Sequence, residues 1–86
     1  MKEIEKILKA VANKRRLAIL KYIKSKKEAS VGDIAGAIKL SFKSTSRHLV
    51  LLTSADILEK EQRSLNSFYS LVPKQKSYIS ALISEL

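Results

Sequence analysis

The chain has 86 residues, with 17 Lys and Arg against eight Asp and Glu, a net charge of +9, 45% hydrophobic residues and no cysteine. This length allows one small domain over residues 1–86, and a domain so small often completes its core with apolar area from a partner chain. The lack of cysteine excludes disulfides, thiolate metal sites and a cysteine nucleophile. No apolar run is long enough for a signal peptide or a membrane span, so we expect a soluble, cytoplasmic protein with no membrane partner.

The positive charge is concentrated near the N-terminus. Residues 1–27 carry ten Lys and Arg and two Glu, residues 28–56 carry three of each sign, and residues 57–86 carry four basic and three acidic residues. Such an excess favours a polyanionic partner, nucleic acid before an anionic membrane surface, because each neutralised phosphate releases condensed counterions. A solvated Lys-rich surface is the alternative interpretation, and charge alone does not decide between the two.

Apolar residues at helical spacing predict four helices in the first two thirds of the chain. These predicted helices cover residues 2–12, 14–25, 31–38 and 42 to about 55. Asn13, Ser30 and Ser41 stand where the second, third and fourth helices need an N-cap. Gly32 and Gly36 each lower the intrinsic stability of the third helix by about 1 kcal/mol, which indicates close packing against a neighbouring helix.

A β-hairpin is predicted after the fourth helix. Residues 57–62 and 67–72 are two strand-like runs, and the polar residues 63–66 between them form a connection of hairpin length. Pro73 ends the second strand because proline cannot donate a hydrogen bond to a ladder. The polar stretch 25–29, earlier in the chain, is interpreted as a loop.

The last segment, residues 75–86, predicts a fifth helix with an apolar stripe that needs another surface to cover it. The chain contains no linker rich in Pro, Gly or Ser, no internal repeat and no low-complexity tract. The predicted fold is therefore mainly α with one small hairpin, in the order four helices, two strands and a final helix.

The third and fourth predicted helices form a helix-turn-helix pattern, and a hairpin directly after them is typical of a winged helix. A helix that reads DNA needs short side chains near its start, so that its backbone approaches the bases, and a long cation that reaches guanine. Cations at its flanks fix its register on phosphates. The predicted base-reading residues are Lys43, Ser44, Ser46 and Arg47. The predicted phosphate contacts are Ser41, His48, Lys14, Arg15, Arg16 and Arg63.

Short motifs at characteristic distances cover nearly the whole chain. They lie at Leu17–Leu20, Val31–Ala37, Leu40-Ser41, Ser46-Arg47-His48-Leu49, Leu52, Ala55 and Phe68-Tyr69-Ser70-Leu71. They resemble the N-R-L-x-I-L-like second helix, the D-[IL]-A third helix, the L-S-x-x-x-x-S-R-H-L-x-x-L recognition element and the Y-x-L strand of the ArsR/SmtB family of winged-helix transcriptional repressors. The resemblance implies a recognition helix in the major groove and a wing tip over the minor groove or backbone.

The same resemblance implies a homodimer built from the first and last helices. Their apolar stripes look exposed in the sequence, which independently favours a partner chain. The residues that match the dimer helices are Ile4, Ile7, Leu8, Val11, Tyr78, Ile79, Leu82 and Ile83.

The chain departs from the family in its metal-sensing positions. Residues 29–33 lack the C-x-C pattern that many members show, and residues 75–86 contain no histidine and one carboxylate. Metals of the zinc type need several convergent ligands, so we expect no metal and no cofactor. Asp56 replaces a common glycine, which a left-handed Asp allows, and Arg63-Ser64 replaces a frequent Gly-Arg at the wing. Val50 stands where a polar residue is common, and nothing in the sequence explains it.

The chain has no pair of carboxylates, Ser/His/Asp set or Gly-rich phosphate loop, so we expect no catalytic residues and no enzyme activity. We predict a homodimeric, sequence-specific regulator of transcription, a repressor without metal sensing that binds a pseudo-palindromic site in double-stranded DNA. Two alternatives stay open, namely a winged-helix module that docks another protein and an architectural DNA-binding protein without a preferred site. The sequence does not determine the operator or an inducer.

Overall fold

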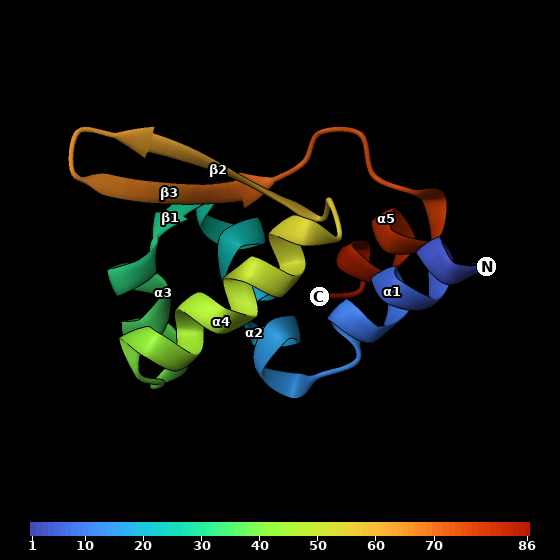
Figure 1. The fold of residues 1–86 in the computed structure, drawn as a ribbon, viewed down its shortest axis with the longest axis horizontal. Helices are drawn as coiled ribbons and strands as arrows, with labels where there is room; N and C mark the ends of the chain where they lie inside the picture. The colour runs from blue at the N-terminus through green and yellow to red at the C-terminus, as the bar shows by residue number, and fades with distance from the viewer.

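The computed structural model describes all 86 residues as five helices and a three-stranded sheet (Figure 1). The elements are α1 (Lys2–Val11), α2 (Lys14–Lys26), β1 (Glu28–Ser30), α3 (Val31–Ile38), α4 (Phe42–Ser54), β2 (Leu58–Arg63), β3 (Asn66–Leu71) and α5 (Ser77–Ser84). The predicted winged helix-turn-helix order is confirmed, and each predicted helix is present. None of these helices has the length and apolar character needed to cross a membrane.

The three predicted N-caps are confirmed. The Asn13 side-chain oxygen accepts hydrogen bonds from the backbone N–H groups of Arg15 and Arg16, at 2.9 and 3.1 Å. Ser30 caps α3 and Ser41 caps α4 in the same way, each accepting from the N–H three residues later. These side chains satisfy N–H groups that the first turn of a helix leaves without partners, so the sequence defines where three helices begin.

The sheet contains one strand more than the sequence predicts. Strand β1 pairs antiparallel with β3, which in turn pairs with β2, and Ala29 lies opposite Tyr69 in this ladder. The prediction of a loop over residues 25–29 is therefore wrong at both ends, because α2 continues to Lys26 and β1 begins at Glu28. A three-residue strand is too short to show alternation, and its partner lies far along the chain, so no local pattern reveals it.

The hairpin turn is tighter than predicted. Arg63 and Asn66 pair across the ladder, so the connection is Ser64-Leu65 and not the four residues 63–66. Ser64 has a φ of 56°, the left-handed conformation typical of the first position in a two-residue hairpin turn. Asp56, after α4, also has a positive φ of 58°, which confirms the expectation for this position.

The core lies between the helices and one face of the sheet. Its most deeply buried apolar side chains, each at most 1% exposed, are Ile19, Leu20, Ile23, Ile34, Leu49, Leu52, Ile57, Leu58 and Ile79. Thr45 is the one buried polar residue, and its hydroxyl has no hydrogen-bond partner. The two glycines do not mark close packing as predicted, because a Cβ added at Gly32 or Gly36 would meet nothing within 4 Å.

Candidate nucleic-acid interface

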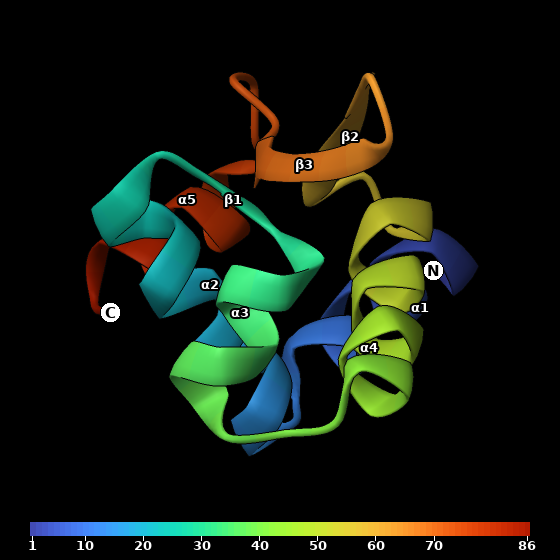
Figure 2. The same ribbon diagram turned by 90° about the vertical axis from the view of Figure 1, so that its left-hand side faces the viewer.

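The two helices of the helix-turn-helix and the hairpin tip share one end of the molecule. In Figure 1 the tip, α3 and the start of α4 lie at the left, whereas α1 and α5 lie at the right. Seen from the left-hand end, α3 and α4 stand side by side below the hairpin (Figure 2). This arrangement separates the end with the candidate reading helix from the end with the first and last helices.

Helix α4 presents one face to the core and the opposite face to solvent. Thr45, Leu49 and Leu52 are fully buried, as the spacing of residues along one side of a helix requires. Lys43 and Arg47 are exposed one turn apart on the outer face, and neither side chain makes an ion pair or hydrogen bond within the chain. The predicted reading residues Ser44 and Ser46 are half-buried at the flanks of this face.

The outer face of α4 also carries apolar residues. Phe42 and Val50 are each 63% exposed, and Leu51 is 46% exposed. Phe42, at the start of the helix, therefore lies on the surface and not in the core. Nothing in the structure explains why Val50 stands at this exposed position.

Arg16 is one of two predicted phosphate contacts whose guanidinium the structure pairs within the chain. Its Nε donates to the Ala10 carbonyl oxygen at 2.5 Å, and Nη2 donates to the Lys9 carbonyl oxygen at 3.2 Å. Its Nη1 lies 3.1 Å from Nδ1 of His48 on α4. The guanidinium is thus used within the chain, where it joins the last carbonyls of α1 to the candidate reading helix.

His48 is held as a neutral imidazole by this environment. Burial, followed by the nearby charges of Arg16 and Arg15, lowers the pKa of His48 below its usual 6.5. Because a guanidinium only donates hydrogen bonds, Nδ1 of His48 accepts and its proton is on Nε2. His48 therefore offers DNA one N–H donor and no positive charge. Sequence reasoning missed this pairing because the two residues lie far apart in the chain and neither carries a local pattern.

Arg63 is also engaged within the chain. Its guanidinium pairs with both oxygens of Glu28, at 2.6 and 2.7 Å, and with Glu61 at 2.6 Å, and it lies 4.8 Å from the centre of the Phe68 ring. The hydrogen bonds that Arg63 donates to the two carboxylates raise the pKa of Arg63, and Arg63 lowers the pKa of Glu28. Leu65, at the turn, is 94% exposed. The wing thus presents an apolar tip and an arginine whose charge is offset.

The remaining predicted phosphate residues are accessible. Lys14 is exposed and Arg15 is half-buried at the start of α2, and neither side chain has a partner within the chain. The Ser41 oxygen accepts the N–H of Ser44 at 3.1 Å, which leaves its hydroxyl hydrogen free to donate. The structure therefore leaves Lys14, Arg15 and Ser41 available to an anion.

The first and last helices use half of their apolar stripe inside the protomer. Four of the eight residues predicted at a dimer interface, Ile7, Val11, Ile79 and Ile83, are at most 8% exposed. They are covered because α1 packs on α2 and α4, and α5 packs on α2. The residues of the set that keep surface are Ile4, Leu8, Tyr78 and Leu82. An apolar stripe seen in the sequence does not show which of its residues lie in the core and which lie at an interface.

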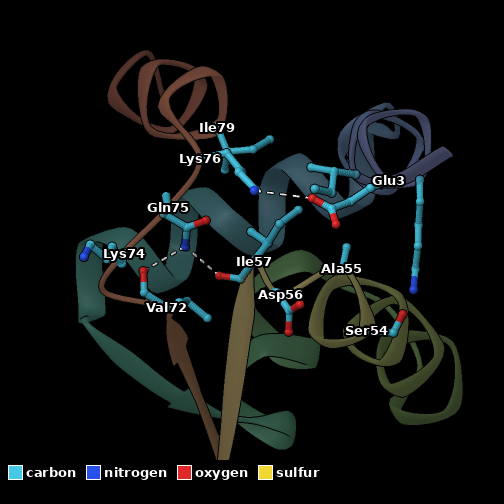
Figure 3. Close-up of a pocket in the computed structure, with 12 residues that line it drawn as sticks. Glu3, Ser54, Ala55, Asp56, Ile57, Val72, Lys74, Gln75, Lys76 and Ile79 are labelled. Atoms are coloured by element: carbon cyan, nitrogen blue, oxygen red, sulfur yellow. Dashed lines mark hydrogen bonds and ion pairs between the residues drawn. The ribbon is translucent and has the colours of Figure 1, made fainter. Parts of the chain in front are cut away.

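A cavity of about 520 Å³ lies where α1, the end of α4 and the start of α5 meet. On its wall, the Gln75 side-chain N–H group donates to the carbonyl oxygens of Ile57 and Val72, at 2.8 and 2.9 Å (Figure 3). Lys76 pairs with Glu3 of α1 at 3.3 Å, as the same figure shows. These contacts fix α5 against the root of the wing, and the mixed charges of the lining indicate no single class of ligand.

The structure contains no group of three or more His, Cys, Asp or Glu side chains placed to hold a metal ion. The fold is a helix-turn-helix followed by a wing. The second helix of the motif exposes cations and hydroxyl groups, and its cations have no partner within the chain. These features define a winged-helix DNA-binding domain.

Comparison with known proteins agrees with this class. A family model described as "Bacterial regulatory protein, arsR family" matches residues 13–60. The transcriptional activator HlyU of Vibrio cholerae is 31% identical over 80 residues, which are 93% of this chain and 73% of that protein. The chain belongs to the ArsR family, and it is a DNA-binding transcriptional regulator.

Solved structures show the same fold. Reduced HlyU from V. cholerae superposes with a TM-score of 0.82 at 31% identity, over 98% of this chain and 84% of that one. A homodimeric winged helix-turn-helix DNA-binding domain from Mycobacterium bovis gives a TM-score of 0.82 at 25% identity, over 98% and 74%. NolR from Sinorhizobium fredii gives 0.79 at 29% identity, over 98% and 83%.

Proposed function

We propose that two copies of this chain bind a pseudo-palindromic operator, each placing α4 in the major groove of one half-site. The observation that carries this proposal is the outer face of α4, where Lys43 and Arg47 lie exposed and unpaired beside Ser44 and Ser46. Two recognition helices in successive major grooves stand about 34 Å apart, so the half-sites should be spaced by about one helical turn.

The homodimer is supported by the M. bovis relative and by the surface left on the outer helices. That relative is described as a homodimeric domain. In this chain Leu8 of α1 is 47% exposed, and Ile4, Tyr78 and Leu82 are half-buried. We propose that these four residues form the apolar centre of the interface, while the buried members of the two stripes support it from within the protomer.

The reading residues divide the work by chemistry. Arg47 is the residue we assign to a guanine, because a guanidinium reaches O6 and N7 of this base with two hydrogen bonds. The short Ser44 and Ser46 allow the helix backbone to approach the base edges, and Lys43 extends the reading face. Lys14, Arg15 and Ser41 would contact phosphates, because their side chains have groups free to do so. We assign Arg16 and His48 instead to holding α4 in place.

We propose that the protein represses transcription by occupying the operator. We also propose that no metal regulates it and that it acts in the cytoplasm. The relative HlyU is named as an activator, so the sign needs its own measurement. A reporter gene placed behind the selected operator should lose expression when the protein is present. A gain in expression would overturn the proposed sign and leave DNA recognition unaffected.

Selection of bound duplexes from a random pool tests the recognition itself. We expect a palindromic sequence, and an Arg47→Ala variant should lose about 1–3 kcal/mol of discrimination at one position of each half-site. Arg15→Ala is the matched control, because it should weaken all duplexes alike. If Arg47→Ala selected the same sequence with the parent's affinity, Arg47 would not be the reading residue.

The salt dependence of binding tests the electrostatic part. If each protomer neutralises three or four phosphates, the logarithm of the association constant should fall with the logarithm of salt concentration at a slope of about −5 to −7. A flat response, together with no selected sequence, would favour the alternative of a protein-docking module, for which exposed Val50 and Leu51 would supply the surface. Salt-dependent binding with no selected sequence would favour the architectural alternative.

A further inference from the structure

A groove on the outer side of α2 has a composition that DNA binding alone does not require. It has a volume of about 650 Å³ and lies between α2, from Lys14 to Ser25, and the C-terminal end of α3. This volume is within the range of about 300–1,000 Å³ that is usual for small-molecule sites. Figure 2 shows the start of α2 and the α3–α4 connection at the same end of the molecule, close to the proposed DNA-binding face.

The rim of the groove is positively charged and has no counter-charge. Lys14, Arg15 and Lys21 of α2 and Lys39 after α3 line it, and no Asp or Glu does. None of these four cations takes part in any ion pair of the described chain, whose ion pairs involve Lys9, Arg63 and Lys76. Four like charges around one concavity repel each other and attract an anion, which their combined field concentrates there.

The floor of the groove is apolar. Ala18 and Tyr22 of α2 face Ala37 and Ile38 of α3, and Tyr22 and Ile38 are only half-buried in the free chain. The Tyr22 hydroxyl makes no hydrogen bond within the chain, so a donor and acceptor is available beside the apolar surface. A phosphate of the DNA backbone would use the rim and leave this floor exposed to water.

We infer that this groove binds a small amphipathic anion, an organic carboxylate with an aromatic or aliphatic body. Its apolar body would cover Ala18, Tyr22 and Ile38, and its carboxylate would lie among Lys14, Arg15 and Lys39. Both halves of the site are needed for this assignment, because a simple inorganic anion would leave the apolar floor exposed to water, and a neutral apolar molecule would leave the charges of the rim without a partner.

Such a ligand would compete with DNA, a consequence that rests on the proposed function. Lys14 and Arg15 are shared between the groove and the proposed phosphate contacts, and a carboxylate bound between them removes the charge that the backbone would use. The groove would then be the place where a metabolite with this chemistry releases the regulator from its operator.

The experiment is a titration of the whole protein, without DNA, with naphthalene-2-carboxylate as the probe. Nuclear magnetic resonance would follow the backbone amides, and we expect shifts at residues 18–22 and 37–39. The uncharged naphthalene-2-methanol and inorganic phosphate are the two reference ligands. Each should bind at least about tenfold more weakly, because each lacks one half of the interaction.

Three variants make the assignment specific. Replacing both Lys14 and Lys39 by Gln should weaken carboxylate binding about tenfold or more. Lys26→Gln with Lys27→Gln is the matched control, since it removes the same charge outside the groove and should leave binding unchanged. Ala18→Leu, at an exposed position of α2, fills the floor and keeps every charge, so it should also abolish binding.

Several results would overturn the inference. Shifts located outside the groove, equal binding of the alcohol or of phosphate, or equal losses in the Lys26/Lys27 control would each do so. A second titration uses the selected operator, which naphthalene-2-carboxylate should displace in the parent but not in the Ala18→Leu variant. Because the first titration contains no DNA, failure of the groove and failure of operator binding are separate outcomes. If the ligand bound the groove but did not displace the operator, only the shared use of Lys14 and Arg15 would be refuted, and the groove would remain a ligand site.

Discussion

Replacing Arg16 by Ala should destabilise the protein more than replacing any other single Lys or Arg by Ala. The side chain makes two hydrogen bonds to the end of α1, at Ala10 and Lys9, and a third to His48. A hydrogen bond to a charged group contributes about 1.5–3 kcal/mol when it is buried, and a cation at a helix C-terminus adds about 0.3–1 kcal/mol. Since Arg16 is only half-buried, we expect a total loss of about 2–3 kcal/mol, well below the sum of the separate terms.

Urea unfolding at one fixed protomer concentration measures this loss, since the stability of a dimer depends on concentration. The matched control is Arg15→Ala, one residue away on the same helix, with the same change of charge and no side-chain hydrogen bond to lose. It should change the free energy of unfolding by less than about 0.5 kcal/mol. In a thermal scan the Arg16 variant should melt roughly 10–20 °C lower than the parent.

The single histidine supplies a second, local measurement. A nuclear magnetic resonance titration follows one imidazole signal, and the pKa of His48 should rise in Arg16→Ala because a neighbouring positive charge is removed. If the Arg16 and Arg15 variants unfolded at the same urea concentration, the bridge between α1 and α4 would contribute nothing. An unchanged pKa of His48 would show that Arg16 does not lie beside it in solution.

Three further predictions concern the pH response, the α5 anchor and the wing. Because the folded state holds the pKa of His48 below 6.5, the unfolded chain binds more protons than the folded chain as the pH falls below this value. The contribution of His48 to stability is therefore complete above pH 6.5 and is lost as the pH falls. Between pH 7.5 and 5 a His48→Gln variant should lose less free energy of unfolding than the parent, and equal losses would contradict the assignment. Gln75→Ala should cost about 1–3 kcal/mol in urea unfolding, because two hydrogen bonds are lost, to the carbonyls of Ile57 and Val72, although the Ile57 carbonyl keeps the backbone N–H of Val72. A cost near zero would mean that water replaces the amide. Replacing both Glu28 and Glu61 by Gln should release Arg63 for the DNA backbone, because these two carboxylates hold its guanidinium. Fluorescence anisotropy should then give tighter duplex binding with a steeper salt dependence, whereas unchanged binding would place the wing away from DNA.

The features that the sequence predicts well are those with a local physical cause. Helices α2, α3 and α4 begin where Asn13, Ser30 and Ser41 can cap them, and the inward positions of α4 follow the 3.6-residue period. The hairpin follows from two strand-like runs before Pro73. Each of these signals is contained within about ten residues, so no knowledge of the rest of the fold is needed.

The features that the sequence does not predict depend on contacts between distant segments. Strand β1 forms because Ala29 pairs with Tyr69 of β3, and this pairing brings Glu28 to the wing, where its carboxylate forms an ion pair with Arg63. Arg16 is drawn to the end of α1 rather than to solvent, although its position in a basic run suggests a phosphate contact. The same limit applies to the apolar stripes, whose buried and exposed members differ only in what packs on them.

The pairing of β1 with β3 also limits how far the protein can be divided. The segment that carries the family pattern, residues 13–60, contains β1, α4 and the reading residues, but the strand that β1 pairs with begins at Asn66. The core contacts that Ile79 supplies also lie beyond it. An isolated 13–60 fragment would leave these surfaces uncovered, so the reading motif is not an autonomous folding unit and acquires its shape only after the C-terminal part of the chain has been added.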